Sequence, residues 1–184
     1  VDENDNEEVR YDNNNASKSI LVRPQYGLEV STEDFSDAVD VNEIASFDID
    51  IKNVGLRTDN YTISVSVLDP LWEINFPSSV SNVLTNTTES FTVDFIPNSN
   101  VTAATHQFNV TVTSEGNSSR LDSVIVNIEV RQYYDIKLEM PLSEQRVFPG
   151  TTLSYPVRIT NNGNGDDTFD LYSTNDWNSQ IRID

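Results

Sequence analysis

Cysteine is absent from the 184 residues, and histidine and methionine occur once each. The absence of cysteine excludes a small disulfide scaffold but leaves the compartment open, because prokaryotic surface proteins also fold without disulfides. No Gly-rich phosphate loop, G-x-S-x-G elbow or histidine cluster of the metal-binding type occurs. No catalytic residue is therefore predicted, and the chain is not expected to be an enzyme.

Long apolar runs are also missing, since none approaches the ~18 residues of a membrane span. No membrane insertion is expected within this sequence. The chain starts at Val1 and shows no signal-peptide h-region, so we expect a processed or excised product.

Basic residues are scarce, with 11 Lys and Arg against 30 Asp and Glu, and the formal net charge is −19. Such a charge repels nucleic acid and anionic lipid, so neither is expected as a partner. It favours solubility, tolerance of high salt, or binding of divalent cations.

Residues 1–19 are acidic, rich in asparagine and nearly free of aliphatic side chains. Such a stretch buries too little apolar surface to offset the entropy of ordering it. It is predicted to be a flexible leader, or alternatively an arm that orders on a neighbouring subunit.

From Ile20 onward the sequence alternates with period two, as where Phe47, Ile49 and Ile51 alternate with polar residues. This alternation is typical of half-buried antiparallel strands and excludes a helical fold. The predicted strands are Ile20–Arg23, Leu28–Ser31, Ser46–Lys52, Tyr61–Leu68, Trp72–Phe76, Phe91–Phe95, Phe108–Thr113, Val124–Arg131 and Tyr133–Glu139. Short strands at this spacing predict a two-sheet sandwich over residues 20–131.

An internal repeat relates residues 47–63 to residues 155–171 at an offset of 108 without a gap. The shared positions are Asn53, Gly55 and Tyr61 in the first copy and Asn161, Gly163 and Phe169 in the second, and a tryptophan follows each copy, Trp72 and Trp177. Self-similarity at the spacing of one domain is typical of a tandem array. The predicted fold is therefore all-β: tandem immunoglobulin-like antiparallel β-sandwiches, of which the second, over residues 132–184, is incomplete.

The repeated pattern of an alternating strand, Asn-x-Gly, a polar loop, Asp-x-aromatic-x-aliphatic and a tryptophan resembles the immunoglobulin-like modules of prokaryotic surface proteins. These are the CARDB-like domains and the NEW3-type domains of archaeal and bacterial extracellular proteins. The resemblance covers most of residues 28–131 and all of 133–184. It implies an extracellular or cell-surface location and a non-catalytic role, and it transfers no ligand residues.

The second module stops after its first four predicted strands, which leaves one hydrophobic face uncovered. The residues that would need a cover are Leu153, Tyr155, Val157, Ile159, Phe169, Leu171, Ile181 and Ile183. Truncation is one explanation, with the missing strands beginning just past Asp184. Completion by a strand from another chain is the other, with the leader and Ile20–Arg23 as candidate donors.

Six N-x-Ser/Thr sequons are candidate N-glycosylation sites, in predicted loops or on the polar faces of strands: Asn15, Asn60, Asn86, Asn100, Asn109 and Asn117. N-linked glycans are therefore expected, against the alternative of unmodified surface asparagines.

Acidic and amide groups could bind Ca²⁺, which takes six to eight oxygen ligands. The candidate ligands are Asn161, Asn164, Asp166, Asp167 and Asp170, and a second cluster is the leader run Asp2, Glu3, Asp5, Glu7 and Glu8. Neither cluster matches an EF-hand loop, and the alternative for the first is a solvated polar loop between two strands.

Four aromatic residues, Trp72, Tyr133, Tyr134 and Trp177, could form a sugar-binding platform. The repeated position of the tryptophans favours core packing instead, and the two tyrosines are expected to pack between modules. His106 is expected at the solvent-exposed surface.

Three functions stay open. The first is a structural or adhesion module array of a glycosylated cell-surface or filament protein, whose partners are neighbouring modules or subunits. The second is an accessory stalk or carbohydrate-binding module of a larger secreted glycosidase or peptidase. The third is a polymer subunit assembled by β-strand donation.

Overall fold

The structure is a computed structural model that describes residues 23–66, 70–142, 144–174 and 180–181. The predicted leader, residues 1–19, lies outside the described residues. So do Asn15, Trp177, Ile183 and most of the predicted strand Ile20–Arg23.

The described residues form strands and no helix, as the alternation predicts. The strands are β1 Leu28–Thr32, β2 Ser36–Val39, β3 Ala45–Asn53, β4 Asp59–Val65, β5 Trp72–Asn75, β6 Ser79–Val83, β7 Thr88–Pro97, β8 Ala104–Ser114, β9 Leu121–Val130, β10 Ile136–Glu139 and β11 Arg158–Asn161. No described helix could span a bilayer.

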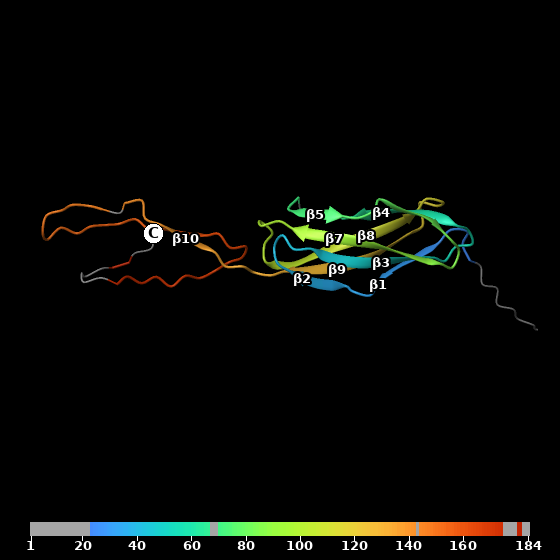
Figure 1. The fold of residues 1–184 in the computed structure, drawn as a ribbon, viewed down its shortest axis with the longest axis horizontal. Helices are drawn as coiled ribbons and strands as arrows, with labels where there is room; N and C mark the ends of the chain where they lie inside the picture. Colours follow the sequence, from blue (N-terminus) through green and yellow to red (C-terminus); the bar gives the residue numbers. More distant parts are fainter. Residues whose placement is uncertain (1–22, 67–69, 143, 175–179, 182–184) are drawn as a thin grey trace, which may run out of the picture.

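Nine strands make the first sandwich (Figure 1). One sheet has four strands in the order β1-β3-β7-β5, and the other has five in the order β2-β9-β8-β4-β6. The pairs are antiparallel except β2 with β9, which run parallel. The fold is therefore an immunoglobulin-like β-sandwich, as the sequence predicts.

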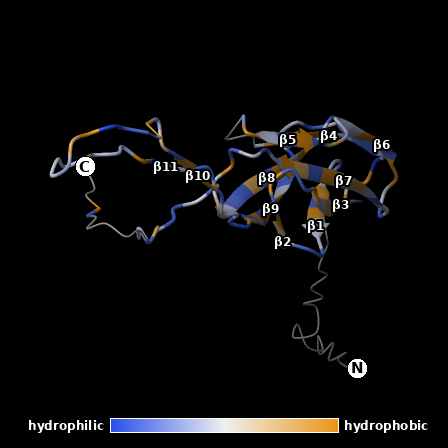
Figure 2. Ribbon diagram, turned by 60° about the vertical axis from the view of Figure 1, so that its left-hand side comes forward, coloured by the Kyte–Doolittle hydropathy of each residue, from blue (hydrophilic) through white to orange (hydrophobic). Residues whose placement is uncertain are grey.

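The core lies between the two sheets and consists of the apolar positions of the alternating strands. In β3 the odd-numbered positions from Ala45 to Asn53 are buried, whereas the even ones are exposed or half-buried. Phe95 of β7 packs edge-on against Phe47, at 5.9 Å between ring centroids, and lies 4.6 Å from Phe108 of β8. Figure 2 shows the hydrophobic positions recurring along these strands.

Two strands of the first sandwich were not predicted, β2 and β6. The sequence Ser36-Asp37-Ala38-Val39 holds one large apolar residue, so it shows no periodicity. Strand β6 begins at Ser79, two residues after Pro77, and only Val80 and Val83 are apolar in it. Both are edge strands, on which half of the backbone groups and most side chains face solvent, so neither leaves a strong hydrophobic signal.

The second repeat extends from one end of the first sandwich (Figure 1). Its described part contains two paired strands, β10 and β11, where four had been predicted. Strand β10 begins at Ile136 rather than at Tyr133. Apolar side chains that the sequence expected to need a cover are exposed, including Val157 at 52 % and Leu171 at 41 %, while Ile159 and Phe169 are half-buried.

The two repeats share their strand register. Leu28 pairs with Asn53 in the first repeat, and Ile136 pairs with Asn161 in the second. Both members of the pair are displaced by 108 positions, the offset of the sequence repeat. The self-similarity of the sequence is therefore also a self-similarity of the fold.

Candidate functional site

The Asn-x-Gly motif forms the same turn in both repeats. Asn53 Oδ1 accepts a hydrogen bond from the Gly55 N–H at 2.9 Å, and its Nδ2 donates to the Arg57 carbonyl at 2.8 Å. Asn161 Oδ1 accepts from the Gly163 N–H at 2.9 Å, and its Nδ2 donates to the Gly165 carbonyl at 2.8 Å. The side chain satisfies the backbone where the strand ends, which explains why asparagine is repeated there.

Each turn also receives the segment that precedes the first strand of its repeat. A Cβ on Gly55 would lie 2.9 Å from the carbonyl oxygen of Gln25, and a Cβ on Gly163 would lie 2.5 Å from that of Tyr133. Real Cβ atoms do not approach backbone oxygens so closely, so only glycine allows this contact. The motif therefore anchors the chain that enters each repeat. In the second repeat this entering chain is the segment between β9 and β10, residues 131–135, which we call the linker.

Asn164 holds this linker and is buried, with 7 % of its surface exposed. Its Oδ1 accepts a hydrogen bond from the Tyr133 N–H at 2.8 Å, and its Nδ2 donates to the Arg131 carbonyl at 3.0 Å. Its own carbonyl accepts from the Ala103 N–H of the first sandwich at 2.8 Å. One residue thus connects the linker to both repeats, and we call this contact the junction.

The two tyrosines of the linker have different environments. The hydroxyl of Tyr133 lies 3.4 Å from the Ser99 carbonyl of the first sandwich and 3.1 Å from the Asn162 carbonyl of the second repeat. Tyr133 therefore packs between the modules, as expected. Tyr134 does not, because 70 % of it is exposed.

Asp59 and Asp167 are a second equivalent pair at the offset of 108. Each accepts a hydrogen bond from the next N–H, that of Asn60 at 2.9 Å and that of Thr168 at 2.7 Å. Asp59 is buried and also accepts from the Ser114 hydroxyl at 2.5 Å and from the Gly116 N–H at 3.0 Å, which holds the turn between β8 and β9. Asp167 is exposed.

The predicted calcium ligands are mostly engaged in these backbone contacts. The side-chain amides of Asn161 and Asn164 bind the turn and the linker, and the Asp166 carbonyl accepts from Gln132 Nε2 at 2.8 Å. Among the described residues no group of three or more His, Cys, Asp or Glu side chains is placed to hold a metal ion. Calcium binding at this loop, with Asp170, stays a prediction.

Tyr61 is fully buried in the core, and its hydroxyl lies 3.3 Å from the Gly27 carbonyl. Burial, and secondarily the negative charge of Asp59, raises the pKa of Tyr61 to about 12. Both effects disfavour the tyrosinate, so the phenol stays protonated in the folded protein far above neutral pH.

Trp72 packs in the core, as its repeated position indicates, with 6 % of its surface exposed. The prediction for His106 was wrong, because it is half-buried rather than solvent-exposed. Its ring stacks edge-on against Trp72 at 5.2 Å, and its Nε2 lies 3.0 Å from the Thr102 carbonyl. This contact depends on the packing of β5 against β8 across the two sheets, which the alternation of residues within a single strand does not reveal.

The described sequons fall into two groups. Asn86, Asn100 and Asn117 lie exposed in turns or loops. Asn60 lies on β4, where its Nδ2 donates to Glu115 and its Oδ1 accepts from the Asn82 N–H. Asn109 lies half-buried on β8, and its Oδ1 is buried without a hydrogen-bond partner among the described residues. The three turn sites are therefore the more accessible to a modifying enzyme.

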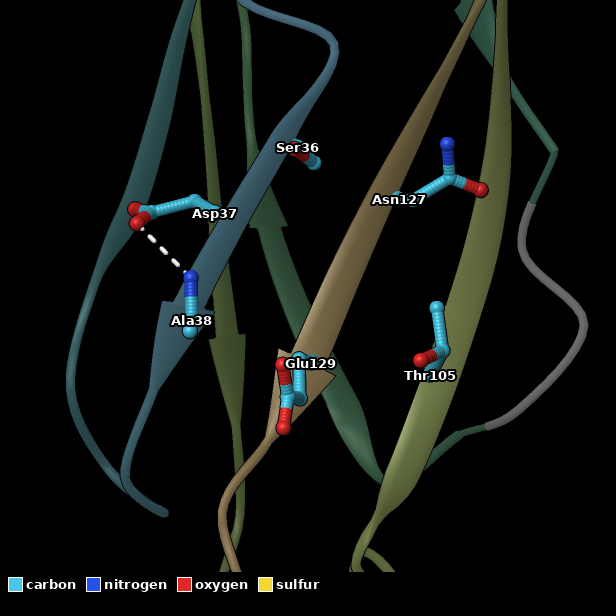
Figure 3. A pocket seen from close by; sticks show the side chains of 6 residues that line it. All are labelled: Ser36, Asp37, Ala38, Thr105, Asn127 and Glu129. Carbon is cyan, nitrogen blue, oxygen red and sulfur yellow. Dashed lines mark hydrogen bonds between the residues drawn. The ribbon is translucent and has the colours of Figure 1, made fainter.

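Two shallow depressions occur on the first sandwich. The one in Figure 3, of about 340 Å³, is lined by Ser36, Asp37, Ala38, Thr105, Asn127 and Glu129. The carboxylate of Asp37 turns back to the N–H of Ala38 and points away from Glu129 (Figure 3). These two carboxylates do not face each other across a space, as those of a glycosidase do.

No protein-family model matches this chain, and no curated protein is similar to it in sequence. Solved structures are similar at low identity. A family 123 glycoside hydrolase from Clostridium perfringens shares 12 % identity over 58 % of this chain and 27 % of that one, with a TM-score of 0.46.

Domains 4 and 5 of the S-layer protein SbsC share 16 % identity over 58 % of this chain and 53 % of that one, with a TM-score of 0.35. A PapD-like domain of human CEP192 shares 11 % identity over 62 % of this chain and 92 % of that one, with a TM-score of 0.40. This chain thus spans about a quarter of the length of the glycoside hydrolase structure and about half of the length of the S-layer structure. The assignment to the immunoglobulin-like sandwiches rests on the strand order.

Proposed function

We propose that this chain is a non-catalytic structural segment of an extracellular or cell-surface protein, in which sandwich modules of the CARDB-like or NEW3 type follow one another at fixed orientation. The observation that carries the proposal is the junction, where Asn164 bonds to the linker and to Ala103 of the first sandwich. Because these bonds tie the linker to both repeats, they restrict its backbone. The two modules therefore act together as a rigid spacer rather than as beads on a string.

The surface chemistry supports the same function. The two depressions on the first sandwich are shallow, and the carboxylates that line the one in Figure 3 diverge. Three accessible sequons and a net charge of −19 suit a soluble, glycosylated surface. An accessory stalk of a secreted enzyme would use the module in the same way, and the sequence of the whole gene separates the two functions.

A second candidate, assembly by strand donation, is favoured by the open β10–β11 pair. Leu138 and Val157 are 66 % and 52 % exposed. In the first repeat, the equivalent residues Val30 and Ile49 face the core. A strand from another chain could cover such a face.

The location is tested by surface labelling. Intact cells of the native source are treated with a membrane-impermeant amine reagent, and the protein is then analysed by mass spectrometry. We expect Lys52 and Lys137, both on exposed strand positions, to be labelled before lysis. Labelling only after lysis would contradict the proposal. A cytoplasmic protein labelled only in lysed cells is the control.

A further inference from the structure

The two outer faces of the first sandwich differ in charge. We call the outward positions of β1, β3, β5 and β7 the acidic face. Its carboxylates are Glu29, Asp48, Asp50, Glu73 and Asp94. Lys52 is the one cation among these described positions, and it lies 4.0 Å from Glu29.

The opposite face is almost without charge. We call the outward positions of β4, β8 and β9 the uncharged face, and they carry hydroxyl, amide and aliphatic side chains. Glu129, at one end of β9 beside the depression of Figure 3, is the one charge among these described positions. Two aliphatic residues project from it into solvent, Leu121 at 59 % and Ile125 at 47 % exposure.

Three carboxylates of the acidic face accept hydrogen bonds from hydroxyls of the neighbouring strand. Ser46 donates to Asp94 at 2.6 Å, Thr92 to Asp48 at 2.7 Å and Ser90 to Asp50 at 2.5 Å, in each case across the β3–β7 pair. Among the described outward residues of this face Lys52 alone is basic, so the face repels an equally acidic neighbour.

We propose that the uncharged face is the surface through which a second copy of this chain packs laterally, sheet against sheet. The inference rests on the proposed function, since a surface assembly needs lateral as well as end-to-end contacts. In a chain of net charge −19, this is the face on which two copies approach with the fewest carboxylates, since Glu129 is the one among its described positions. Burying neutral hydroxyl and amide groups also costs less than burying ions.

The size of the face suits a weak, reversible contact. Its three strands, about 4.8 Å apart and of seven, eleven and ten residues, present roughly 450 Å². That is below the roughly 800 Å² per partner of a standard protein interface. Ile125 lies opposite Asn109 in the β8–β9 register, near the middle of the face, where an apolar anchor contributes most.

The proposed contact and glycosylation of Asn109 exclude each other. A glycan on Asn109 would occupy the centre of the uncharged face and prevent the contact. The half-buried position of Asn109 on β8 agrees with an unmodified side chain. A native protein fully glycosylated at Asn109 would overturn the proposal.

Sedimentation equilibrium of the 184-residue chain, produced in a host without N-glycosylation, tests the contact. We expect reversible dimers that strengthen when NaCl is raised from 0.05 to 1 M, roughly from a 14 Å to a 3 Å screening length, because salt screens the net charge. Ile125→Asp and the nearly isosteric Gln107→Glu should each weaken dimerisation about tenfold. Ser31→Asp, which adds the same charge to the acidic face, should change it less than twofold.

Three results would overturn the proposal. The chain could stay monomeric at millimolar concentration in 1 M NaCl. Ser31→Asp could weaken dimers as much as Ile125→Asp does. Alternatively, Leu138→Asp could abolish dimers that Ile125→Asp leaves intact, which would assign the contact to the open β10–β11 face. None of these results bears on the location measured by surface labelling, so failure here is distinct from failure of the proposed function.

Discussion

Asn53 and Asn161, 108 positions apart, form the same pair of hydrogen bonds to the residues two and four positions further on. In both repeats the glycine of the motif lies against the backbone that enters the module. The entering segment is therefore a built part of each module, and this makes the junction a defined contact rather than a flexible tether.

Asn53→Ala should lower the free energy of unfolding by about 2–4 kcal/mol, because it leaves the Gly55 N–H and the Val83 carbonyl without this buried partner. The matched variant Asn161→Ala should cost at most about 1 kcal/mol, since Asn161 is exposed. Urea unfolding followed by Trp72 fluorescence in a Trp177→Phe background measures the first variant, and urea dependence of amide hydrogen exchange in β11 measures the second. Equal losses would contradict the different burial of the two turns.

Asp59→Ala should destabilise the first sandwich by about 3 kcal/mol. It removes the acceptor of the Ser114 hydroxyl and of the Gly116 N–H, which hold the β8–β9 turn. Asp167→Ala is the control at the equivalent position and should stay within about 0.5 kcal/mol. Amide hydrogen exchange of residues 114–121 should accelerate in the first variant alone. Unchanged exchange there would show that Asp59 does not hold the turn.

The free energy of unfolding should fall at high pH because of the ionisation of Tyr61. Its pKa is about 12 in the folded protein against about 10 when unfolded, so the unfolded chain releases the proton first as the pH rises. The contribution is fully present below pH 10 and is lost between pH 10 and 12, up to about 3 kcal/mol. Tyr61→Phe should remove this slope. A slope equal in both proteins would mean that other groups cause it.

Glycans should be found on Asn86, Asn100 and Asn117. They should not be found on Asn60, whose side chain is hydrogen-bonded to Glu115 and Asn82, or on Asn109, which is half-buried on β8. Peptide mapping of the native protein by mass spectrometry checks each site. Thr88→Ala, which removes the sequon of Asn86, should lower the intact mass by one glycan. Occupancy of Asn60 in preference to the turn sites would contradict the accessibility argument.

The alternation of apolar residues was sufficient to predict the strands with one buried face, such as β3 and β7, and the offset of 108 predicted the repeated turn. The edge strands β2 and β6 were not predicted, because side chains that face solvent show no apolar periodicity.

The role of Asn164 was not predicted for another reason. It has no equivalent in the first repeat, where Leu56 occupies the position, and its partners Ala103 and Tyr133 come from distant parts of the chain.

The central claim is that the junction fixes the two repeats relative to each other. The most direct test is to measure the distance between two spin labels by pulsed electron–electron double resonance. The chain has no cysteine, so Ser64→Cys and Arg158→Cys place one spin label on each repeat. We predict a single narrow distance distribution that broadens when Asn164→Ala removes the side-chain bonds to Arg131 and Tyr133. Ser123→Ala, far from the linker, should leave it narrow. A broad distribution in the chain that retains Asn164 would contradict the account.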